Sequence, residues 1–295
     1  MKINVISDTK IRDASIDLEV IHFMVKKLKA TIDLSLQPVS AYKIEKKATI
    51  NFFINCANYN FFKDAKVNVA LIDHTIITKN VLEYLPLFDY VFVKDKYTKS
   101  ILESYTNNSP VRPNYICFGW GSPSITEFSK NKNYSKVLLY IPSLRDDIFT
   151  RIIQLWKSEY PTLEIVGAER LKNRTIAENI NYNDNISNDE FHNLFNEVGF
   201  HLIPEKYNGY SHFVNQCKQV GSIPICLDTA SNRELVNDDV GYLIPCKNAK
   251  VKNKSILDNI GPTLSVNTDS LRNTLEIAFS KNIVNHEFMS KYNVT

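Results

Sequence analysis

The feature that most constrains the fold is an alternation of short apolar runs with helical segments, which occurs twice along the chain. Short, near-continuous apolar runs are typical of strands that are buried on both faces of a parallel sheet. A regular order of strand and helix favours a sheet covered by helices on both faces. We therefore expect an α/β fold of two doubly wound, Rossmann-like domains. Strands are expected at 2–7, 32–36, 49–55, 67–72 and 89–93 in the first domain, and at 136–141, 163–166, 200–203 and 223–227 in the second.

The clearest helical pattern lies at 16–30, where Ile16, Val20, Phe23 and Leu28 share one face. Residues 107–133 are rich in Pro, Gly, Ser and Asn, which favour loops and linkers. Further helices are expected at 98–105, 147–156, 188–198, 213–220, 270–279 and 286–292. These patterns predict an N-terminal domain at 1–110, a linker at 111–134, a C-terminal domain at 135–269 and terminal helices at 270–295, whose return to the N-terminal domain is left open.

Composition narrows the class of protein. The net charge of +3 is close to neutral and the lysines are scattered, so nucleic acid is not expected as a main partner. The five cysteines are widely spaced and form no C-x-x-C pair, which favours reduced, mostly buried thiols over zinc ligands or disulfides. No apolar run is long enough for a signal peptide or a membrane span. We expect a soluble, cytoplasmic protein.

A polar segment separates two predicted strands of the second domain. The strand at 200–203 leads into a loop at 205–211, a helix begins near His212, and Gly221 ends that helix before the strand at 223–227. In open parallel sheets, ligands bind beyond the carboxyl ends of the strands, where helix N-termini offer free N–H groups to anions. The sequence therefore predicts a ligand-binding edge at this segment.

The same segment resembles the donor-binding signature of the family-four glycosyltransferases, which are retaining enzymes of GT-B fold. Residues 208–211 (NGYS) stand where the signature has E-G-F-G, and Gln216 stands at its second glutamate. Residues 221–226 (GSIPIC) are similar to G-x-P-V-V. Residues 234–238 (ELVND) and 240–245 (VGYLIP) are similar to the acidic tail E-L-V-x-D followed by G-x-L-V-P.

Weaker similarities connect the chain to glycosyltransferases of this group from large DNA viruses. Residues 115–119 (YICFG) resemble a Y-x-G-F segment, and 212–216 (HFVNQ) resemble H-[YF]-[IV]-N-E. Residues 154–167 (QLWKSEYPTLEIVG) resemble T-W-x-x-x-P-x-x-P-x-L-x-I-x-G. The resemblance covers most of residues 67–245. It implies a GT-B arrangement in which the two domains face a cleft, and, for a viral protein, a location in the host-cell cytoplasm.

The resemblance also implies an activity. The protein would transfer a hexosyl or pentosyl group from a nucleotide-diphosphate sugar to a glycan, protein or small-molecule acceptor, with no metal and no cofactor besides the donor. Cations and helix dipoles would stabilise the diphosphate. The candidate catalytic residues are Asp73, His74 and His212. The candidate substrate-binding residues are Ser143, Arg145, Glu205, Asn208, Gly209, Tyr210, Ser211, Asn215, Gln216 and Glu234.

Several candidates also have a structural interpretation. Arg145 is either a phosphate contact, or a solvated side chain or ion-pair partner of Asp146 or Asp147. His212 is either a hydrogen-bond donor to a sugar or phosphate, or a capping or core residue. Asp73, which follows a strand, either meets the acceptor together with His74 or caps a following helix.

The remaining candidates are open in the same way. Glu205 either contacts the sugar or lies in a solvated loop, and Glu234 either binds the donor or pairs within a helical turn. Lys218 and Arg233 are weaker phosphate candidates, since Arg233 is also suited to a salt bridge. Trp120 either stacks on a base or sugar, or packs as an aromatic side chain near the domain junction.

Two positions depart from the signature. Asn208 and Gln216 are amides where it has glutamates. An amide still hydrogen-bonds a hydroxyl, but it lacks the charge-assisted bonds of a carboxylate. A catalytically inactive nucleotide-sugar-binding protein is therefore an alternative. A transferase that glycosylates nucleic-acid bases is a second alternative, which the near-neutral charge disfavours.

Overall fold

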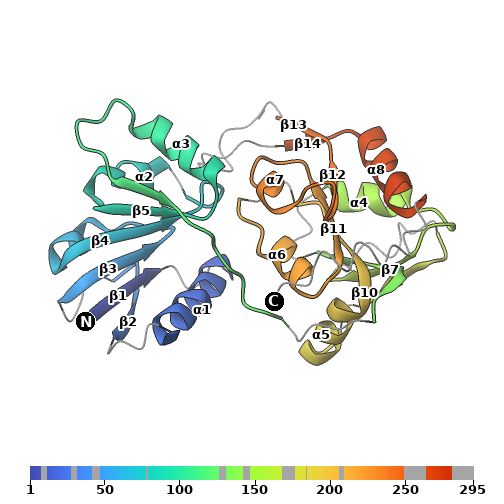
Figure 1. The fold of residues 1–295 in the computed structure, drawn as a ribbon, viewed down its shortest axis with the longest axis horizontal. Coiled ribbons are helices and arrows are strands. Elements are labelled where there is room, and N and C mark those ends of the chain that lie inside the picture. Colours follow the sequence, from blue (N-terminus) through green and yellow to red (C-terminus); the bar gives the residue numbers. More distant parts are fainter. Residues whose placement is uncertain are drawn as a thin grey trace. The chain divides into compact units, whose positions relative to one another are not determined.

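Figure 1 shows the computed structural model of the chain. It describes residues 1–7, 12–27, 32–41, 47–77, 79–125, 131–141, 147–167, 177–183, 185–205, 209–248 and 264–280. These residues form two compact units. The first comprises the described residues of Met1–Pro123 together with Gly209 and Tyr210, and the second comprises the other described residues.

The first unit contains a six-stranded sheet of order β2-β1-β3-β4-β5-β6, in which every pair of neighbours is parallel. The five strands predicted for the first domain are present. The sixth, β6, lies within the stretch for which the sequence predicts a linker, because its four residues give too short a pattern to stand out among Pro and Asn. The strands are β1 (Lys2–Ser7), β2 (Asp33–Pro38), β3 (Ala48–Ile54), β4 (Ala65–Ile72), β5 (Tyr90–Val93) and β6 (Asn114–Cys117).

Three buried asparagines form a ladder across the middle of this sheet. Asn4 on β1 is opposite Asn51 on β3, and Asn51 is opposite Asn68 on β4. The amide of Asn4 donates to Oδ1 of Asn51 at 3.1 Å, and that of Asn51 donates to Oδ1 of Asn68 at 3.3 Å and to the carbonyl of Phe61 at 2.7 Å. The ladder supplies hydrogen-bond partners to polar groups that burial would otherwise leave unpaired.

The second unit contains another six-stranded parallel sheet, of order β12-β11-β10-β7-β8-β9. The four strands predicted for the second domain are present. Two short edge strands, β9 and β12, were not predicted. The strands are β7 (Asn133–Tyr140), β8 (Thr162–Val166), β9 (Ile180–Tyr182), β10 (Val198–Ile203), β11 (Ile223–Leu227) and β12 (Tyr242–Ile244), and a separate antiparallel pair is formed by β13 (Cys246–Asn248) and β14 (Leu264–Val266).

Helices cover both faces of the second sheet. Phe200 and Leu202 on β10 belong to the core that includes side chains of α4 and α8, whereas Ile203 on the same strand packs with side chains of α6. This alternation is the doubly wound packing that the sequence predicts. The helices of this unit are α4 (Asp147–Leu155), α5 (Asn188–Glu197), α6 (His212–Gln219), α7 (Asn232–Leu235) and α8 (Thr268–Ser280). The expected helix at 286–292 lies outside the described residues.

The first unit carries α1 (Arg12–Lys27), α2 (Lys79–Leu82), α3 (Lys96–Thr106) and two short 3-10 helices, Tyr59–Asp64 and Leu85–Leu87. None of the five cysteines, all of which lie in the described residues, forms a disulfide, and three of them are buried. Burial raises the pKa values of the Cys217 and Cys226 thiols, which keeps both protonated and unreactive. Within the described part of the chain, no helix combines the length and apolarity that crossing a bilayer requires.

Candidate functional site

The carboxyl edge of the first sheet gathers polar side chains from three neighbouring strands. Asn55 follows β3, Asp73 and His74 follow β4, and Lys94 follows β5. Because β3, β4 and β5 are adjacent and parallel, their carboxyl ends meet at one edge of the sheet. All four side chains are buried. The predicted position of Asp73 and His74, directly after a strand, is confirmed.

The contacts of Asp73 are those of a turn-capping residue. Its Oδ1 accepts hydrogen bonds from the backbone N–H of Thr75 at 2.9 Å and from the Thr75 hydroxyl at 2.7 Å. Its own N–H donates to Oδ1 of Asn55 at 2.6 Å. Gly209 approaches the same carboxylate, since an added Cβ there would lie 2.2 Å from Oδ1 of Asp73. The structural interpretation of Asp73 therefore accounts for its contacts, although the segment that it caps is a turn and not a helix.

His74 is held from one side. Its Nδ1 lies 2.7 Å from the hydroxyl oxygen of Thr98 on α3, and its ring meets that of Tyr97 edge-on at 5.2 Å. Thr98 in turn donates its hydroxyl hydrogen to Oδ2 of Asp95 at 2.8 Å, and its backbone N–H donates to Oδ1 at 2.7 Å. Asp95 is the N-cap of α3. The imidazole is thus connected to a carboxylate through one hydroxyl.

Lys94, at the same edge, belongs to a second buried cluster. Its ammonium lies 2.7 Å from the carboxylate of Asp17 on α1 and 5.8 Å from the ring centroid of Trp120. The indole N–H of Trp120 donates to Oδ1 of Asp17 at 3.1 Å, and the Tyr210 hydroxyl donates to the Trp120 carbonyl. Trp120 is 7% exposed. Its contacts support the interpretation as a packing aromatic.

Two buried polar atoms at this edge are unsatisfied. Ser7, the last residue of β1, and Asn55 are 0% and 6% exposed, yet among the described residues no partner exists for the Ser7 hydroxyl or the Asn55 side-chain nitrogen. Unpaired buried polar groups cost about 1–3 kcal/mol each and are rare in native structures. The described residues therefore leave both atoms without a hydrogen bond at this edge of the sheet.

The second unit places most of the other candidates around α6. This helix begins at His212, as predicted, with Ser211 as its N-cap: the Ser211 hydroxyl accepts from the backbone N–H of Val214 at 3.2 Å. Because α6 follows β10, its N-terminus lies at the carboxyl edge of the sheet, where free N–H groups favour anions. His212 and Gln216 are buried, and Asn215 is half-buried.

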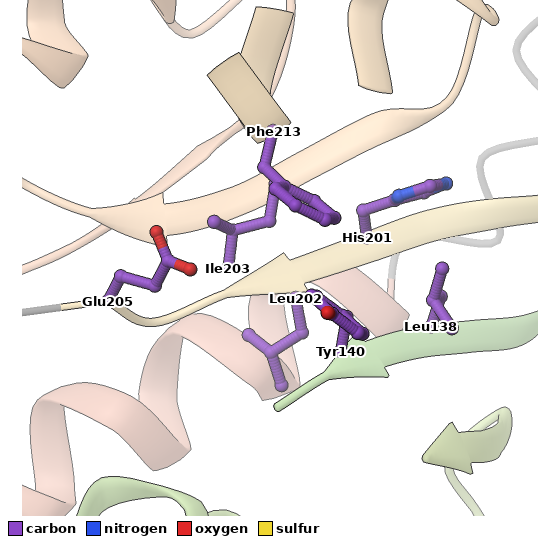
Figure 2. Close-up of a pocket in the computed structure, with 7 residues that line it drawn as sticks. All are labelled: Leu138, Tyr140, His201, Leu202, Ile203, Glu205 and Phe213. Atoms are coloured by element: carbon purple, nitrogen blue, oxygen red, sulfur yellow. The ribbon is translucent and has the colours of Figure 1, made fainter. Parts of the chain in front are cut away.

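A small pocket opens beside this helix. It has a volume of about 10 Å³, room for one water molecule, and is lined by Leu138, Tyr140, His201, Leu202, Ile203, Glu205 and Phe213. Figure 2 shows Glu205 beyond the end of β10, with Ile203 and Phe213 between it and His201. The rings of Tyr140 and Phe213 stack with centroids 5.1 Å apart. Glu205 lines this pocket and is half-buried.

The charged candidates on α6 and α7 are exposed or paired. Glu234 is exposed on α7. Its neighbour Arg233 forms a two-pronged ion pair with Asp228, at 2.5 and 2.7 Å, which supports the salt-bridge interpretation of that arginine. Lys218 donates to the carbonyl of Leu235 at 2.6 Å. Both basic side chains therefore have protein partners, which disfavours them as phosphate ligands.

Three of the predicted site residues, Ser143, Arg145 and Asn208, lie outside the described residues. Within the described ranges, no group of three His, Cys, Asp or Glu side chains is arranged to hold a metal ion. Sequence reasoning missed Asn55, Asp95 and Thr98. Their positions gave a signal, because Asn55 and Asp95 come at or just after predicted strand ends, as Asp73 does.

Comparison with known proteins finds similarity among solved structures, while no protein family and no curated protein matches the chain. The lipopolysaccharide outer core galactosyltransferase WaaB aligns with a TM-score of 0.65 and 12% identity, over 99% of this chain and 94% of WaaB. The pneumococcal O-GlcNAc transferase GtfA, solved with UDP and GlcNAc, aligns with a TM-score of 0.58 and 14% identity, over 82% of this chain and 52% of that one.

A protein from Listeria monocytogenes described as a UDP-N-acetylglucosamine 2-epimerase also aligns, with a TM-score of 0.59 and 12% identity, over 99% of this chain and 91% of that one. The chain spans about half the length of several of the structures that it matches: 56% of the GtfA/B complex chain, 52% of GtfA and 50% of TarM. These likenesses define the fold as that of the GT-B glycosyltransferases and confirm the predicted fold class. Similarity to family four and to viral proteins stays a prediction.

Proposed function

We propose that this chain is a glycosyltransferase that moves a sugar from a nucleotide-diphosphate sugar to a glycan, protein or small-molecule acceptor without a metal ion. The observation that carries the proposal is the start of α6. In a fold shared with known sugar transferases, α6 begins at His212 after the loop that follows β10, and the residues that resemble the donor-binding signature fall on this helix and that loop. The N–H groups at its start suit the diphosphate of a donor.

The proposal assigns a role to each candidate residue. Ser211 and His212 present the N-terminus of α6 to the phosphates, and Arg145, which lies outside the described residues, contacts the same phosphates. Gln216, Asn215 and Glu234 bind the ribose or the sugar. Glu205, which is half-buried and lines the small pocket, contacts the sugar in place of the signature glutamate that Asn208 replaces.

The first unit supplies the groups that act on the acceptor. His74 is the candidate base, and the Ser7 hydroxyl and the Asn55 side-chain nitrogen, which have no partner among the described residues, are further candidates for binding sugar or acceptor hydroxyls. Asp73 contributes through the turn that it caps, since its Oδ1 already accepts two hydrogen bonds from Thr75. The hydrogen-bonding side chains of the first unit suit a ligand that is rich in hydroxyl groups.

Calorimetric titration with a panel of UDP- and GDP-sugars tests the donor site. We expect one donor to bind. Gln216→Ala should weaken the affinity for this donor about tenfold, or by about 1.4 kcal/mol, whereas Gln219→Ala should leave the affinity unchanged. Gln219 is the matched control because it lies on the same helix but is exposed. Absence of binding by every nucleotide sugar would overturn the proposal. Binding and turnover that persist in EDTA are expected for a metal-independent enzyme.

A catalytically inactive nucleotide-sugar-binding protein is the second candidate, and the amide of Gln216 favours it. This candidate predicts donor binding with neither transfer nor hydrolysis, and restoration of turnover by Gln216→Glu or Asn208→Glu. Because an epimerase shares the fold, the sugar product must be identified as well as the nucleotide. A base-glycosylating enzyme predicts salt-dependent DNA binding in a gel-shift assay, which the near-neutral charge disfavours.

A further inference from the structure

The hydrogen bonds around His74 determine which nitrogen of its ring carries the proton. His74, Thr98 and Asp95 are all buried, with exposures of 2%, 0% and 2%. Nδ1 of His74 lies 2.7 Å from the Thr98 hydroxyl oxygen, and that hydroxyl lies 2.8 Å from Oδ2 of Asp95. These three side chains therefore form one continuous series of hydrogen bonds. The series runs from the residue after β4, through α3, to the N-cap of α3.

The direction of each hydrogen bond follows by elimination. An ionised carboxylate only accepts hydrogen bonds, and a hydroxyl has one hydrogen to donate. The Thr98 hydroxyl gives that hydrogen to Asp95, so toward His74 it can only accept. Nδ1 must then carry a hydrogen. The nearest oxygen of Asp73, 4.0 Å from Nδ1, favours the same arrangement because it repels a nitrogen lone pair.

Capping of α3 alone does not require the hydrogen bonds that connect Asp95, Thr98 and His74. The Oδ1 atom of Asp95 already caps α3 by accepting the backbone N–H of Thr98 at 2.7 Å. A valine at position 98 would keep the backbone N–H and the cap. The hydroxyl of Thr98 and the second oxygen of Asp95 are used for the contact that reaches His74.

We infer that Asp95 and Thr98 are positioning residues that hold neutral His74 as the Nδ1–H tautomer, so that its Nε2 is a hydrogen-bond and proton acceptor. In the described part of the chain, no hydrogen bond occupies Nε2. The inference deepens the proposed function and its catalytic part rests on it: Nε2 accepts the proton of an acceptor hydroxyl, whose oxygen bonds to the anomeric carbon. The bond from that carbon to the diphosphate breaks, and the diphosphate leaves with the electron pair.

Nitrogen-15 NMR of the imidazole rings tests the tautomer without any substrate. The chain has six histidines, and the signals of His74 are assigned by their loss in His74→Gln. At about pH 8.5, well above the ordinary histidine pKa of about 6.5, we expect a protonated Nδ1 and an unprotonated Nε2. A protonated Nε2 in the wild type would overturn the inference.

The change Asp95→Asn gives a sharper test, because it should reverse the tautomer. The amide oxygen must still accept the N–H of Thr98, which turns the amide NH₂ toward the Thr98 hydroxyl. That hydroxyl then accepts from Asn and donates to Nδ1, which moves the ring hydrogen to Nε2. Asparagine is also a good N-cap, so the helix is expected to stay folded. An unchanged tautomer in a folded Asp95→Asn variant contradicts the inference.

Variants of Thr98 separate the hydroxyl from the side-chain shape. Thr98→Ser keeps the hydroxyl and should keep the tautomer, whereas Thr98→Val removes it and should lose the preference for Nδ1–H. Thr106→Val is the matched control, since it removes a buried hydroxyl from the same helix without touching His74. A tautomer change in Thr106→Val as large as that in Thr98→Val would overturn the specific role of Thr98.

Activity measurements test the catalytic part separately. A general base contributes about 10²–10⁴-fold to a rate, and we expect kcat to fall at least about tenfold in Thr98→Val and Asp95→Asn, with KM changed less. Thr98→Ser should restore kcat. If the protein transfers no sugar, the proposed function fails while the tautomer result still stands. If the Thr98→Val variant transfers sugar as well as the wild type, the catalytic role of the Asp95–Thr98–His74 hydrogen bonds is refuted.

Discussion

The ammonium group of Lys94 lies 2.7 Å from the carboxylate of Asp17, and the two side chains are 2% and 0% exposed. Removing one partner of a buried ion pair leaves the other charge without compensation and costs about 3–5 kcal/mol. We expect Lys94→Met to lower the free energy of unfolding by this amount, measured by urea denaturation. Lys99→Met is the control, because its ion pair with Glu103 on α3 is largely exposed and should contribute less than about 1 kcal/mol. Equal effects of the two changes would show that the buried pair is not a stabilising centre.

The asparagine ladder predicts a large effect at Asn51. Leucine at this position cannot donate to the Phe61 carbonyl or to Asn68, and cannot accept from Asn4. Each buried group left unpaired costs about 1–3 kcal/mol, so Asn51→Leu should destabilise by several kcal/mol despite its greater apolarity. The exposed Asn114 is the comparison, and Asn114→Leu should change the free energy of unfolding by about 0.5 kcal/mol or less. A stability gain in Asn51→Leu would contradict this prediction.

His201 predicts a component of acid sensitivity. Its ring is buried and in contact with Phe195, and burial lowers its pKa to about 3, whereas unfolding returns it to about 6.5. Above about pH 6.5 the ring is neutral in both states. Between about pH 6.5 and pH 3 only the unfolded chain binds the proton, so the free energy of unfolding falls by up to about 1.4 kcal/mol per pH unit as the pH falls.

The measurement is urea denaturation of the wild type and of His201→Gln from pH 8 to pH 4. Glutamine can still donate to the Phe195 carbonyl, which accepts from Nε2 of His201 at 3.0 Å, but it does not titrate. The stability of the variant should therefore fall less steeply with acid than that of the wild type. Parallel curves would mean that His201 is protonated in the folded protein.

Ser211 and Ser187 allow helix capping to be separated from ligand binding. Each serine is the N-cap of a helix in the second unit, α6 and α5, with the hydroxyl 3.2 Å from a backbone nitrogen. Replacement of either by alanine should cost about 0.5–2 kcal/mol of stability. Under the proposed function, only Ser211→Ala weakens nucleotide-sugar binding in calorimetry. Equal weakening by Ser187→Ala would indicate that the loss follows from general destabilisation.

The parallel sheets were predictable because their inner strands are near-continuous apolar runs, such as those that became β4 and β11. The edge strands β6 and β9 were not, since three or four residues with one buried side chain or none carry almost no periodic signal. In the sequence alone, the three asparagines of the ladder are single polar residues that interrupt apolar strand patterns. Only the observed register shows that they face one another.

The candidate site was predictable where it follows directly from chain order. Asp73 and His74 come after a strand and His212 begins a helix, and the structure places them there. The hydrogen bond between His74 and Thr98 was not predictable from the sequence, because 24 residues separate them. Only the adjacency of β4 and β5 brings the end of one strand to the helix that follows the other.

The asparagine ladder also bears on how the first sheet reaches its correct pairing. Apart from these asparagines, the buried parts of β1, β3 and β4 are mostly apolar, so apolar burial alone distinguishes poorly between alternative alignments. A slip of one residue would place Asn4 opposite Ile50 or Phe52 and turn each side chain to the other face of the sheet. Such an alignment would bury amides with no partner. The three asparagines therefore specify one alignment of β1, β3 and β4 in a sheet whose other residues are nearly interchangeable.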